Sequence, residues 1–309
     1  MSDLLKYNLN YSHEGKGLIN HGASCYFNSL LQCLLSCTSI GEILIKNKDD
    51  KNIKNNKLAC LLLDIWSTKS SDINEQSTEL YKLIVQISQN QKNNVKMDFG
   101  QQDAHEGLMM FLSAMENIPE IYRLFMHRYR TQILCPDCKQ YSANIKEINT
   151  VFEVQPDLKI EQLDKFKDYN TSVQLGEFLR KQNGYVDKNY ICTKCGNKGE
   201  KIKITTLTMV PEILPIVIKK YERKINTPFP LELEFLAKGS KKKYLYKLVA
   251  QSEHSGSTGG GHYWAICNRR NGCKLLNDSH VSDGTLGPTE NTYMIFYHFY
   301  KEERVHYSI

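Results

Sequence analysis

Four of the ten cysteines in this 309-residue chain form two CxxC pairs that lie far apart in the sequence. CPDC contributes Cys135 and Cys138, and CTKCG contributes Cys192 and Cys195. Each CxxC turn presents two thiolates at the spacing of a tetrahedral Zn²⁺ site, so that two turns supply a full ligand set. Because the pairs are too distant for a compact zinc ribbon, we expect a structural zinc site that joins two distant β hairpins. A redox-active pair is the alternative interpretation of a CxxC motif.

The rest of the composition indicates a globular intracellular protein. Hydrophobic residues make up 41% of the chain, which is enough for a core. No apolar run approaches the roughly 20 residues that span a bilayer, and the N-terminal MSDLLKYNLNYSHEGKG lacks the apolar stretch of a signal peptide. We therefore expect a cytoplasmic or nuclear protein with no membrane partner. Disulfides are rare in such compartments. Apart from Cys25, we therefore interpret the cysteines outside the two pairs as ordinary buried or surface thiols, namely Cys33, Cys37, Cys60, Cys267 and Cys273.

The charge of the chain does not favour nucleic acid as a partner. The net charge of +6 is modest for this length, and its lysines are dispersed or lie in runs such as KGSKKK (238–243) that are typical of solvated loops. A nucleic-acid surface would need basic residues interleaved with aromatic ones, and the sequence has no such pattern. A zinc-based nucleic-acid binder is therefore the weaker alternative.

Hydrophobic periodicity predicts helices first, then a zinc-bearing insertion, then a sheet. Apolar residues at i, i+3, i+4 and i+7 begin at Phe27, and helical patterns follow in LACLLLDIW, in TELYKLIVQIS and from about Gln102. The CxxC pairs fall between about Tyr129 and Lys203. Beyond Leu207 the chain is rich in aromatic and β-branched runs, which predict strands. The clearest of these are Tyr244–His254, His262–Asn268 and Thr292–Tyr300, with a glycine-rich loop, GSTGGGH, at 256–262.

Cys25 stands between a small-residue turn, HGAS, and the first apolar helix pattern. A helix N-terminus lowers the pKa of a thiol, which favours the nucleophilic thiolate. A base is offered by His262, which follows three glycines and opens a strand pattern, and an orienting group by Asn277 or Asp278 at the end of another strand. A strand pair would bring His262 and Asn277 side by side. The alternative is an ordinary buried thiol and a surface histidine.

Several segments together resemble one family. GLINHGASCYFNSLLQCL resembles the cysteine box of the ubiquitin-specific proteases, and YKLVAQSEHSGSTGGGHYWAI followed by LLNDSHV resembles their histidine box. FGQQDAHEGLMMFL is similar to their glutamine–aspartate box, and PEILPIVIKKYER and FPLELEFL are similar to the intervening segments. The boxes occur in the family's order and extend from about Gly17 to about Tyr300.

This resemblance implies an α+β fold of the papain-like cysteine protease type, as one catalytic domain. It implies a helical thumb at about residues 1–128, zinc-bearing β fingers at about 129–205 and a β-sheet palm at about 206–309. The cofactor implied is a structural Zn²⁺ in the fingers, in agreement with the CxxC pairs.

The resemblance also implies the catalytic residues. Cys25 is the nucleophile, His262 the base, Asn277 the group that orients the histidine, and Asp278 a neighbour that shares this task. Asn20 matches the family position that supplies an oxyanion-hole amide. Such a preorganised amide contributes about 3–4 kcal/mol to stabilising a tetrahedral oxyanion. Before the cysteine, where the family usually has Asn-Thr, this chain has Ala-Ser.

The implied activity is that of a thiol deubiquitinase, which hydrolyses the (iso)peptide bond after the C-terminal glycine of ubiquitin, with ubiquitin and ubiquitinated proteins as partners. The tail of ubiquitin is Leu-Arg-Leu-Arg-Gly-Gly, and carboxylates bind arginine in bidentate fashion. We expect Asp103 and Glu106, with Gln102, to face the tail, and Tyr263 and the glycine loop ending at Gly261 to enclose its two glycines. Acids that only cap a helix are the alternative. A protease for another ubiquitin-like modifier and a non-cleaving relative also stay open.

Overall fold

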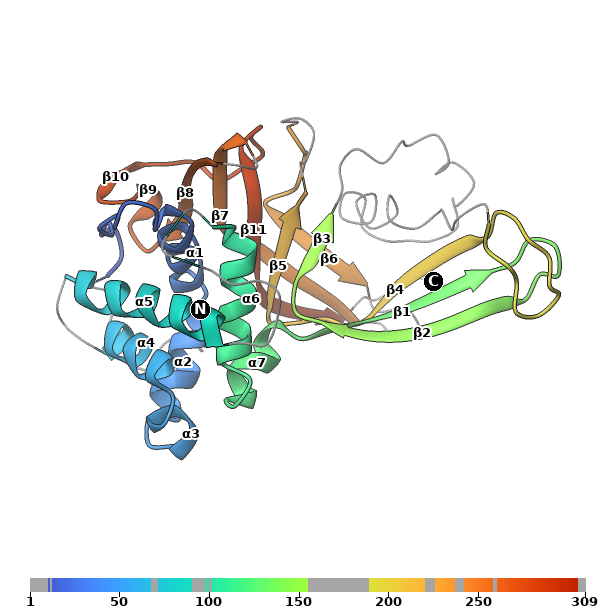
Figure 1. Ribbon diagram of the computed structural model, residues 1–309, viewed down its shortest axis with the longest axis horizontal. Helices are drawn as coiled ribbons and strands as arrows, with labels where there is room; N and C mark the ends of the chain where they lie inside the picture. The colour runs from blue at the N-terminus through green and yellow to red at the C-terminus, as the bar shows by residue number, and fades with distance from the viewer. Residues whose placement is uncertain are drawn as a thin grey trace. The chain divides into compact units, whose positions relative to one another are not determined.

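The chain divides into two compact units, each of which consists of two separate stretches of the sequence. The first unit comprises residues 1–124 and 249–296, and the second comprises residues 125–248 and 297–309 (Figure 1). The three-part division into thumb, fingers and palm remains a prediction. The structure, a computed structural model, describes residues 11, 13–67, 72–90, 98, 100, 102–154, 189–219, 226–236, 242–257 and 260–304.

The helices of the first unit follow the predicted patterns. LACLLLDIW lies in α4, TELYKLIVQIS lies in α5, and the pattern near Gln102 is α6, which begins two residues later. Their order is α1 (Cys25–Leu35), α2 (Thr38–Lys46), α3 (Lys51–Lys54), α4 (Lys57–Ser67), α5 (Asn74–Asn90), α6 (Ala104–Ala114) and α7 (Pro119–Phe125), the last of which ends at the first residue of the second unit.

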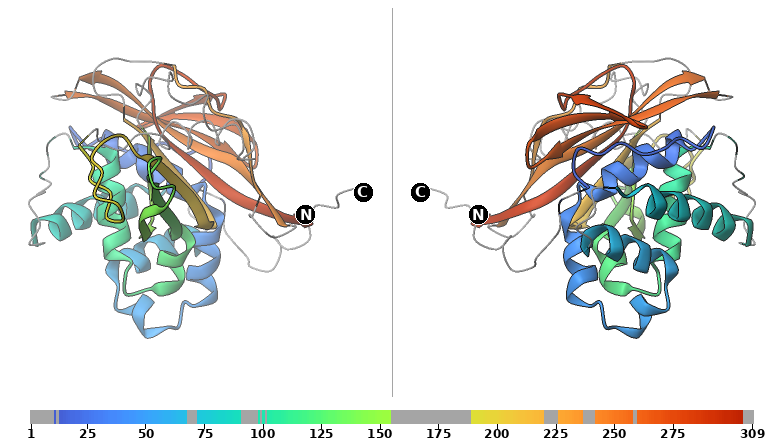
Figure 2. Two further views of the ribbon diagram at one scale, coloured as in Figure 1. Left: turned by 90° about the vertical axis from the view of Figure 1, so that its right-hand side faces the viewer. Right: turned by 90° about the vertical axis from the view of Figure 1, so that its left-hand side faces the viewer.

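Helix α1 is the centre of the first unit. Every one of its residues is buried, as expected of a helix that contacts neighbours on all sides. It packs against β8 (Gly260–Arg269), α6, α2 and α5 (Figure 2). Its polar residues must therefore find partners inside the protein, because an unpaired buried polar group is costly. The hydroxyl of Ser29 meets that of Ser252 at 3.0 Å, which fixes the helix against a strand.

The strands of the first unit are antiparallel and arranged in the order β10-β9-β8-β7. Ser252 of β7 is opposite Ala265 of β8, and Ala265 is opposite Leu276 of β9. In this register, His262 near the start of β8 and Asn277 at the end of β9 lie at the same end of the strand pair. The strands are β7 (Lys242–Ser257), whose last part belongs to this unit, β8, β9 (Gly272–Asn277), β10 (His280–Asp283) and the start of β11 (Thr292–Arg304).

The glycine-rich segment differs from the predicted loop. β7 continues to Ser257 and β8 begins at Gly260, so that Gly256 pairs with Gly261 and Ser257 with Gly260. Residues 258 and 259 lie outside the described part. Gly256 has φ +137°, and a Cβ there would lie 2.4 Å from the Gly260 oxygen. The glycines thus let two strand backbones approach closely in a hairpin instead of forming a long loop.

The second unit contains a three-stranded antiparallel sheet in the order β2-β1-β4. It also contains β5, whose six residues are all buried, with β3 parallel to it, and β6 antiparallel to the first part of β7. A fully apolar run such as that of β5 is typical of a strand buried on both faces. The strands are β1 (His127–Leu134), β2 (Tyr141–Asn149), β3 (Phe152–Val154), β4 (Ile202–Met209), β5 (Ile213–Ile218) and β6 (Glu232–Leu236), with the remainder of β7 and β11.

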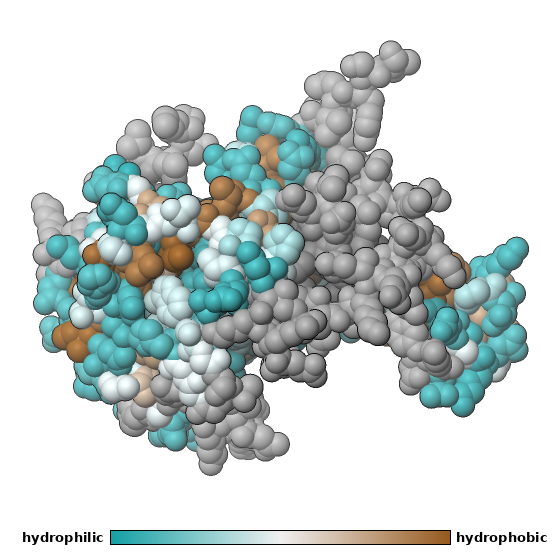
Figure 3. Space-filling model, turned by 90° about the horizontal axis from the view of Figure 1, so that it is seen from above, coloured by the Kyte–Doolittle hydropathy of each residue, from teal (hydrophilic) through white to brown (hydrophobic). Residues whose placement is uncertain are grey.

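Large apolar side chains on the surface of the described residues are scattered. On the face in Figure 3, hydrophobic areas are interrupted by hydrophilic ones. Among the described helices, none is on its own long and apolar enough to cross a membrane; only α1 and α2 together pass that test, as a pair bent by 72°. The exposed large hydrophobic residues are Ile19, Met109, Tyr141, Ile145, Ile148, Ile191, Leu231 and Tyr300.

A buried histidine gives the second unit a predictable dependence on pH. His127 is fully buried: Nδ1 contacts the Phe125 carbonyl at 3.3 Å, Nε2 contacts the Tyr129 hydroxyl at 2.9 Å, and the ring stacks on Phe152. Burial lowers the pKa of His127 to about 4, against about 6.5 for an unfolded chain.

Since the unfolded chain takes up this proton first, the contribution of His127 to stability is complete above about pH 6.5 and is lost as the pH falls towards about 4. Urea unfolding at about pH 7 and about pH 5 should show that wild type loses about 2 kcal/mol more than His127→Phe over this interval. Equal losses in the two proteins would contradict the assignment.

Candidate active site

Cys25 is the first residue of α1 and is buried, with 3% of its surface exposed. Burial raises the pKa of its thiol, the backbone N–H of Tyr263 opposes this effect, and the charge of Asp278 adds to it. The helix N-terminus was expected to lower this pKa, but the loss of solvation is the larger effect. A thiolate at this position therefore depends on a cationic partner, such as a protonated histidine.

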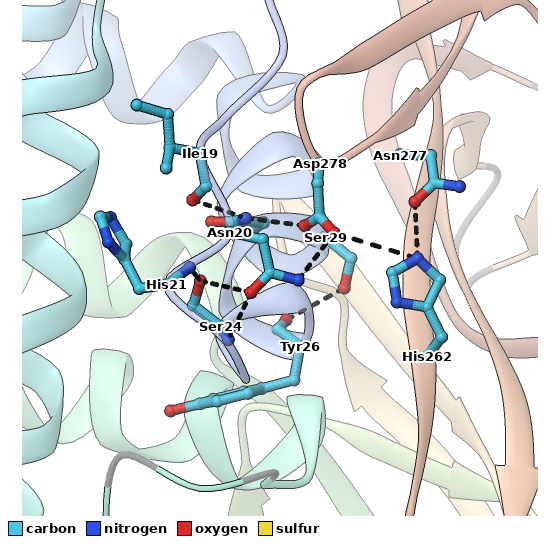
Figure 4. Close-up of polar contacts among 10 residues, drawn as sticks. Ile19, Asn20, His21, Ser24, Tyr26, Ser29, His262, Asn277 and Asp278 are labelled. Atoms are coloured by element: carbon cyan, nitrogen blue, oxygen red, sulfur yellow. Dashed lines mark hydrogen bonds and ion pairs between the residues drawn. The ribbon is translucent and has the colours of Figure 1, made fainter.

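His262 and Asn277 are in direct contact. The Nε2 atom of His262 lies 2.6 Å from Oδ1 of Asn277 (Figure 4). Since an amide oxygen only accepts, Nε2 carries the proton in this hydrogen bond, and Nδ1 of the neutral ring is left as the basic nitrogen. The strand pair therefore brings His262 and Asn277 side by side, as the sequence predicted.

Asp278 lies farther from the histidine and contacts an amide instead. Its Oδ2 atom is 4.0 Å from Nε2 of His262 but only 2.8 Å from Nδ2 of Asn20. The residue occupies the turn between β9 and β10 with φ +50°, a left-handed conformation that Asp and Asn adopt more readily than most residues. The geometry thus makes Asn277, and not Asp278, the hydrogen-bond partner of the imidazole.

The loop before Cys25 is closed by Asn20 and Ser24. The Oδ1 atom of Asn20 accepts from the backbone N–H of Ser24 at 3.2 Å and lies 3.4 Å from its hydroxyl. The hydroxyl oxygen of Ser24 in turn accepts from the backbone N–H of His21 at 2.9 Å. The Ala-Ser pair that departs from the family pattern is therefore compatible with a hydrogen-bonded loop. The amide of Asn20 carries two N–H donors, and its contact with Asp278 uses one of them.

The segment that leads into this loop is pressed against the Asp278 turn. The backbone N–H of Leu18 donates to the Asp278 carbonyl at 2.8 Å. A Cβ on Gly17 would lie 2.5 Å from the backbone of Ser279, so only glycine fits there without a shift. Backbone contacts thus bring residues 17–20 and the turn at 278–279 together in the first unit.

Asn28 is a residue of this site that the sequence patterns did not single out. It lies one turn after Cys25 on α1, is 5% exposed, and donates from Nδ2 to Asp278 Oδ1 at 2.8 Å and to the Ile19 carbonyl at 3.2 Å. An amide inside a largely apolar helix pattern was the available signal, since a buried amide needs polar partners.

The residues expected to bind the substrate tail lie in two different settings. Asp103 is the N-cap of α6, where its carboxylate accepts from the His105 N–H at 2.6 Å and from the Tyr293 hydroxyl. Glu106 is half-buried, and burial followed by the charge of Asp103 raises its pKa. Gln102 donates to Asp98 at 2.7 Å. Asp103 therefore caps the N-terminus of α6.

Tyr263 lies near both these acids and Cys25. It is buried, and burial together with the charges of Asp103, Cys25 and Glu106 raises the pKa of its hydroxyl, which also receives a hydrogen bond from the backbone of Ala104. Its backbone N–H faces the Cys25 thiol. The first unit thus brings Cys25, Tyr263, Asp103 and Glu106 together.

The glycine expected beside the substrate tail lies where no side chain fits. A Cβ on Gly261 would lie 2.2 Å from Nε2 of His254 and 2.6 Å from the Ser255 carbonyl.

The four paired cysteines form one cluster in the second unit. Their sulfurs all lie within 4.8 Å of one another, with 3.8 Å both from Cys135 to Cys195 and from Cys138 to Cys192. A tetrahedral site with Zn–S distances of about 2.3 Å has sulfurs about 3.8 Å apart, so the donor set fits this metal. The cluster can hold a metal ion. Each CxxC turn is closed in the same way, by Lys139 N–H to the Cys135 carbonyl and by Gly196 N–H to the Cys192 carbonyl, both at 2.9 Å.

Comparisons with known proteins identify the family of the chain. A family model described as ubiquitin carboxyl-terminal hydrolase matches residues 16–297. The chain is 25% identical to ubiquitin carboxyl-terminal hydrolase 8 of Saccharomyces cerevisiae over 91% of its own length and 70% of that protein. It is 24% identical to ubiquitin carboxyl-terminal hydrolase 2 of Homo sapiens, over 91% of the chain and 54% of that protein. The chain thus spans 70% of the length of the first of these relatives and 54% of the second.

Solved structures show the same fold. The SAGA DUB module of Ubp8, Sgf11, Sus1 and Sgf73 bound to monoubiquitin matches with a TM-score of 0.73 at 20% identity, covering 97% of this chain and 73% of that chain. The module bound to ubiquitin aldehyde matches with a TM-score of 0.71 at 20% identity, covering 96% and 72%.

Proposed function

The chain belongs to the ubiquitin carboxyl-terminal hydrolase family, as a cysteine-type deubiquitinase of the ubiquitin-specific protease class, and from this premise we propose how its residues hydrolyse the bond after the C-terminal glycine of ubiquitin. The fold is the α+β fold of that class. The observation that carries the proposal is the 2.6 Å contact between His262 and Asn277, in the same unit as a buried Cys25 at a helix start.

In the first half of the reaction, Nδ1 of His262 accepts the Cys25 proton, and the thiolate attacks the glycine carbonyl carbon. The carbonyl π electrons move to oxygen, and the second N–H of the Asn20 amide stabilises that oxyanion. When the tetrahedral intermediate collapses, the C–N bond breaks and the imidazolium gives its proton to the leaving lysine amine. Asn277 holds the ring in position throughout.

In the second half, His262 removes a proton from water, which attacks the thioester. The C–S bond breaks, Cys25 leaves as a thiolate, and ubiquitin is released with a free C-terminal carboxylate. Burial disfavours an isolated thiolate at Cys25, so the imidazolium also stabilises the resting ion pair.

The substrate tail would approach between the start of α6 and β8. Glu106 and Asp103 supply negative charge for the arginines, with Gln102 at the edge, and Gly261 and Tyr263 enclose the two glycines. The charges of Asp103 and Glu106 acting on Tyr263 support this arrangement. Ubiquitin and ubiquitinated proteins are thus the proposed partners, in the cytoplasm or nucleus, with no role for nucleic acid or membrane.

In the second unit, Cys135, Cys138, Cys192 and Cys195 would hold a structural Zn²⁺. Four thiolate ligands leave no open position for catalysis, so the metal would stabilise the fold without taking part in hydrolysis.

The proposal is tested with activity probes that carry ubiquitin or other ubiquitin-like modifiers. We expect covalent labelling of Cys25 by the ubiquitin probe. Labelling only by another modifier would establish the alternative substrate class, and tight ubiquitin binding without labelling would establish a non-cleaving relative.

The neighbours Asn277 and Asp278 should contribute by different routes. Asn277→Ala should lower kcat about 10²–10⁴-fold, since the imidazole loses the acceptor that fixes its orientation. Asp278→Ala should also lower turnover, through Asn20. Steady-state kinetics with a fluorogenic ubiquitin substrate give kcat for both variants. Full turnover by Asn277→Ala would show that Asp278 orients the ring.

A further inference from the structure

The carboxylate of Asp278 is held by two amides from opposite sides. Nδ2 of Asn20 donates to Oδ2 (Figure 4), and Nδ2 of Asn28 donates to Oδ1, each at 2.8 Å. Asn28 itself is buried, and its Nδ2 also donates to the carbonyl of Ile19, the residue before Asn20. Asn28 therefore contacts both the carboxylate that holds Asn20 and the backbone that carries it.

The remaining freedom of Asp278 lies mainly in its side chain. Its backbone is fixed by the turn between β9 and β10 and by the Leu18 N–H, and Gly17 lies against the next residue. A carboxylate can still rotate about χ2, which is a soft torsion. If Oδ1 lost its donor, Oδ2 would no longer be held towards Asn20. The Asn20 amide would then lose the contact that fixes its orientation.

We propose that Asn28 is a positioning residue of the hydrolysis, which acts through Asp278 to aim the Asn20 amide at the oxyanion. This inference rests on the proposed function and extends it to a residue that touches neither the substrate nor the reacting atoms. Asn28 fixes one carboxylate oxygen, the other oxygen fixes Asn20, and the free N–H of Asn20 is thereby preorganised before the oxyanion forms.

The expected effect is on kcat rather than on KM. Removing an oxyanion donor outright costs about 10²–10³-fold, so loosening it in Asn28→Ala should lower kcat by about 10-fold to 100-fold and change KM by less than about 3-fold. Asn28→Asp keeps the side-chain size but places a second carboxylate against Asp278, so it should lose at least as much. A space-filling role would leave Asn28→Asp nearly active.

Ubiquitin aldehyde provides a readout of the oxyanion itself, because its thiohemiacetal with Cys25 carries that oxygen. In Asn28→Ala its inhibition constant should weaken by about the same factor as kcat, while the dissociation constant of unmodified ubiquitin stays unchanged. Alkylation of Cys25 by iodoacetamide forms no oxyanion and should keep its wild-type rate. A parallel fall in alkylation would overturn the proposal, since it would mean that Asn28 acts through the Cys25–His262 pair.

The decisive measurement is the double variant with Asn20→Ala. If Asn28 acts through Asn20, Asn28→Ala should have no further effect on kcat in that background, whereas independent roles would multiply. Ser29→Ala is the matched control: it removes a buried hydrogen bond of the same helix to Ser252, and it should lower the unfolding temperature while keeping kcat. If Asn28→Ala does not fold, Asn28→Asp and its combination with Asn20→Ala carry the same comparison.

The failure of this inference can be distinguished from that of the proposed function. A wild-type protein that neither hydrolyses ubiquitin substrates nor reacts with the ubiquitin probe would refute the function and the inference with it. An active wild type with multiplicative losses in the double variant would refute the role of Asn28 alone.

Discussion

Cys25→Ala should reduce hydrolysis of a fluorogenic ubiquitin substrate by about 10⁴-fold or more. The variant has no sulfur at position 25 that can form the thioester. Among the other cysteines of the first unit, Cys33, Cys37 and Cys267 are buried in the core. Binding of ubiquitin should persist, because the residues proposed for the tail are unchanged.

Cys60→Ser is the control for general effects of thiol loss. Cys60 is half-exposed on α4, and its sulfur contacts the carbonyl of Ile53, away from the residues of the candidate active site. It should retain wild-type kcat and KM. Undiminished turnover by Cys25→Ala, with mass spectrometry showing the intended substitution, would remove Cys25 from the mechanism and with it the roles inferred for His262 and Asn20.

The sequence was sufficient to predict the elements whose signal is local. Helix periodicity located α4, α5 and α6, and aromatic and β-branched runs located β7, β8 and β11. The α+β fold class and the family are confirmed by the family match and by the similar structures. These features follow from neighbouring residues in the chain, so a single sequence contains them.

Features that depend on contacts between distant segments could not be predicted from local sequence patterns. The pKa of Cys25 depends on how much solvent the folded chain removes, and burial exceeds the helix effect that its position suggests. The two amides on Asp278 come from positions about 250 residues away, and no local pattern connects them. The glycines where β7 and β8 meet were predicted to form a loop, because glycine is typical both of turns and of close backbone approach.

For Asp103 the sequence allowed two interpretations, namely a ligand for the substrate tail and a helix cap. The structure realises the capping role, with an added hydrogen bond from Tyr293 of β11. It also places this charge near Tyr263, which lies near Cys25. A carboxylate can perform both functions, because a cap uses only part of its acceptor capacity.

Removing the metal should affect the second unit before it affects the chemistry of the first. We expect one Zn²⁺ per chain, and its extraction by a chelator, or Cys135→Ser, should cost several kcal/mol in the stability of this unit, given about 10–16 kcal/mol for thiolate-rich zinc sites in peptides. Elemental analysis and titration of free thiols check the first part. Cys273→Ser, which changes a half-buried thiol outside the cluster, should keep the full zinc content.

Hydrogen exchange locates the second part of this prediction. The amides of Lys139 and Gly196 close the two CxxC turns by donating to the carbonyls of Cys135 and Cys192. Their protection should therefore depend on a metal ion that holds the two turns together. On chelation these amides should exchange much faster, followed by those of β1 and β2, while the amides of α1 keep their protection. Protein without zinc and with four freely reactive thiols would contradict the metal site. Zinc loss that leaves both turns protected would instead show that the hydrogen bonds of the sheet alone hold the cysteine cluster in place.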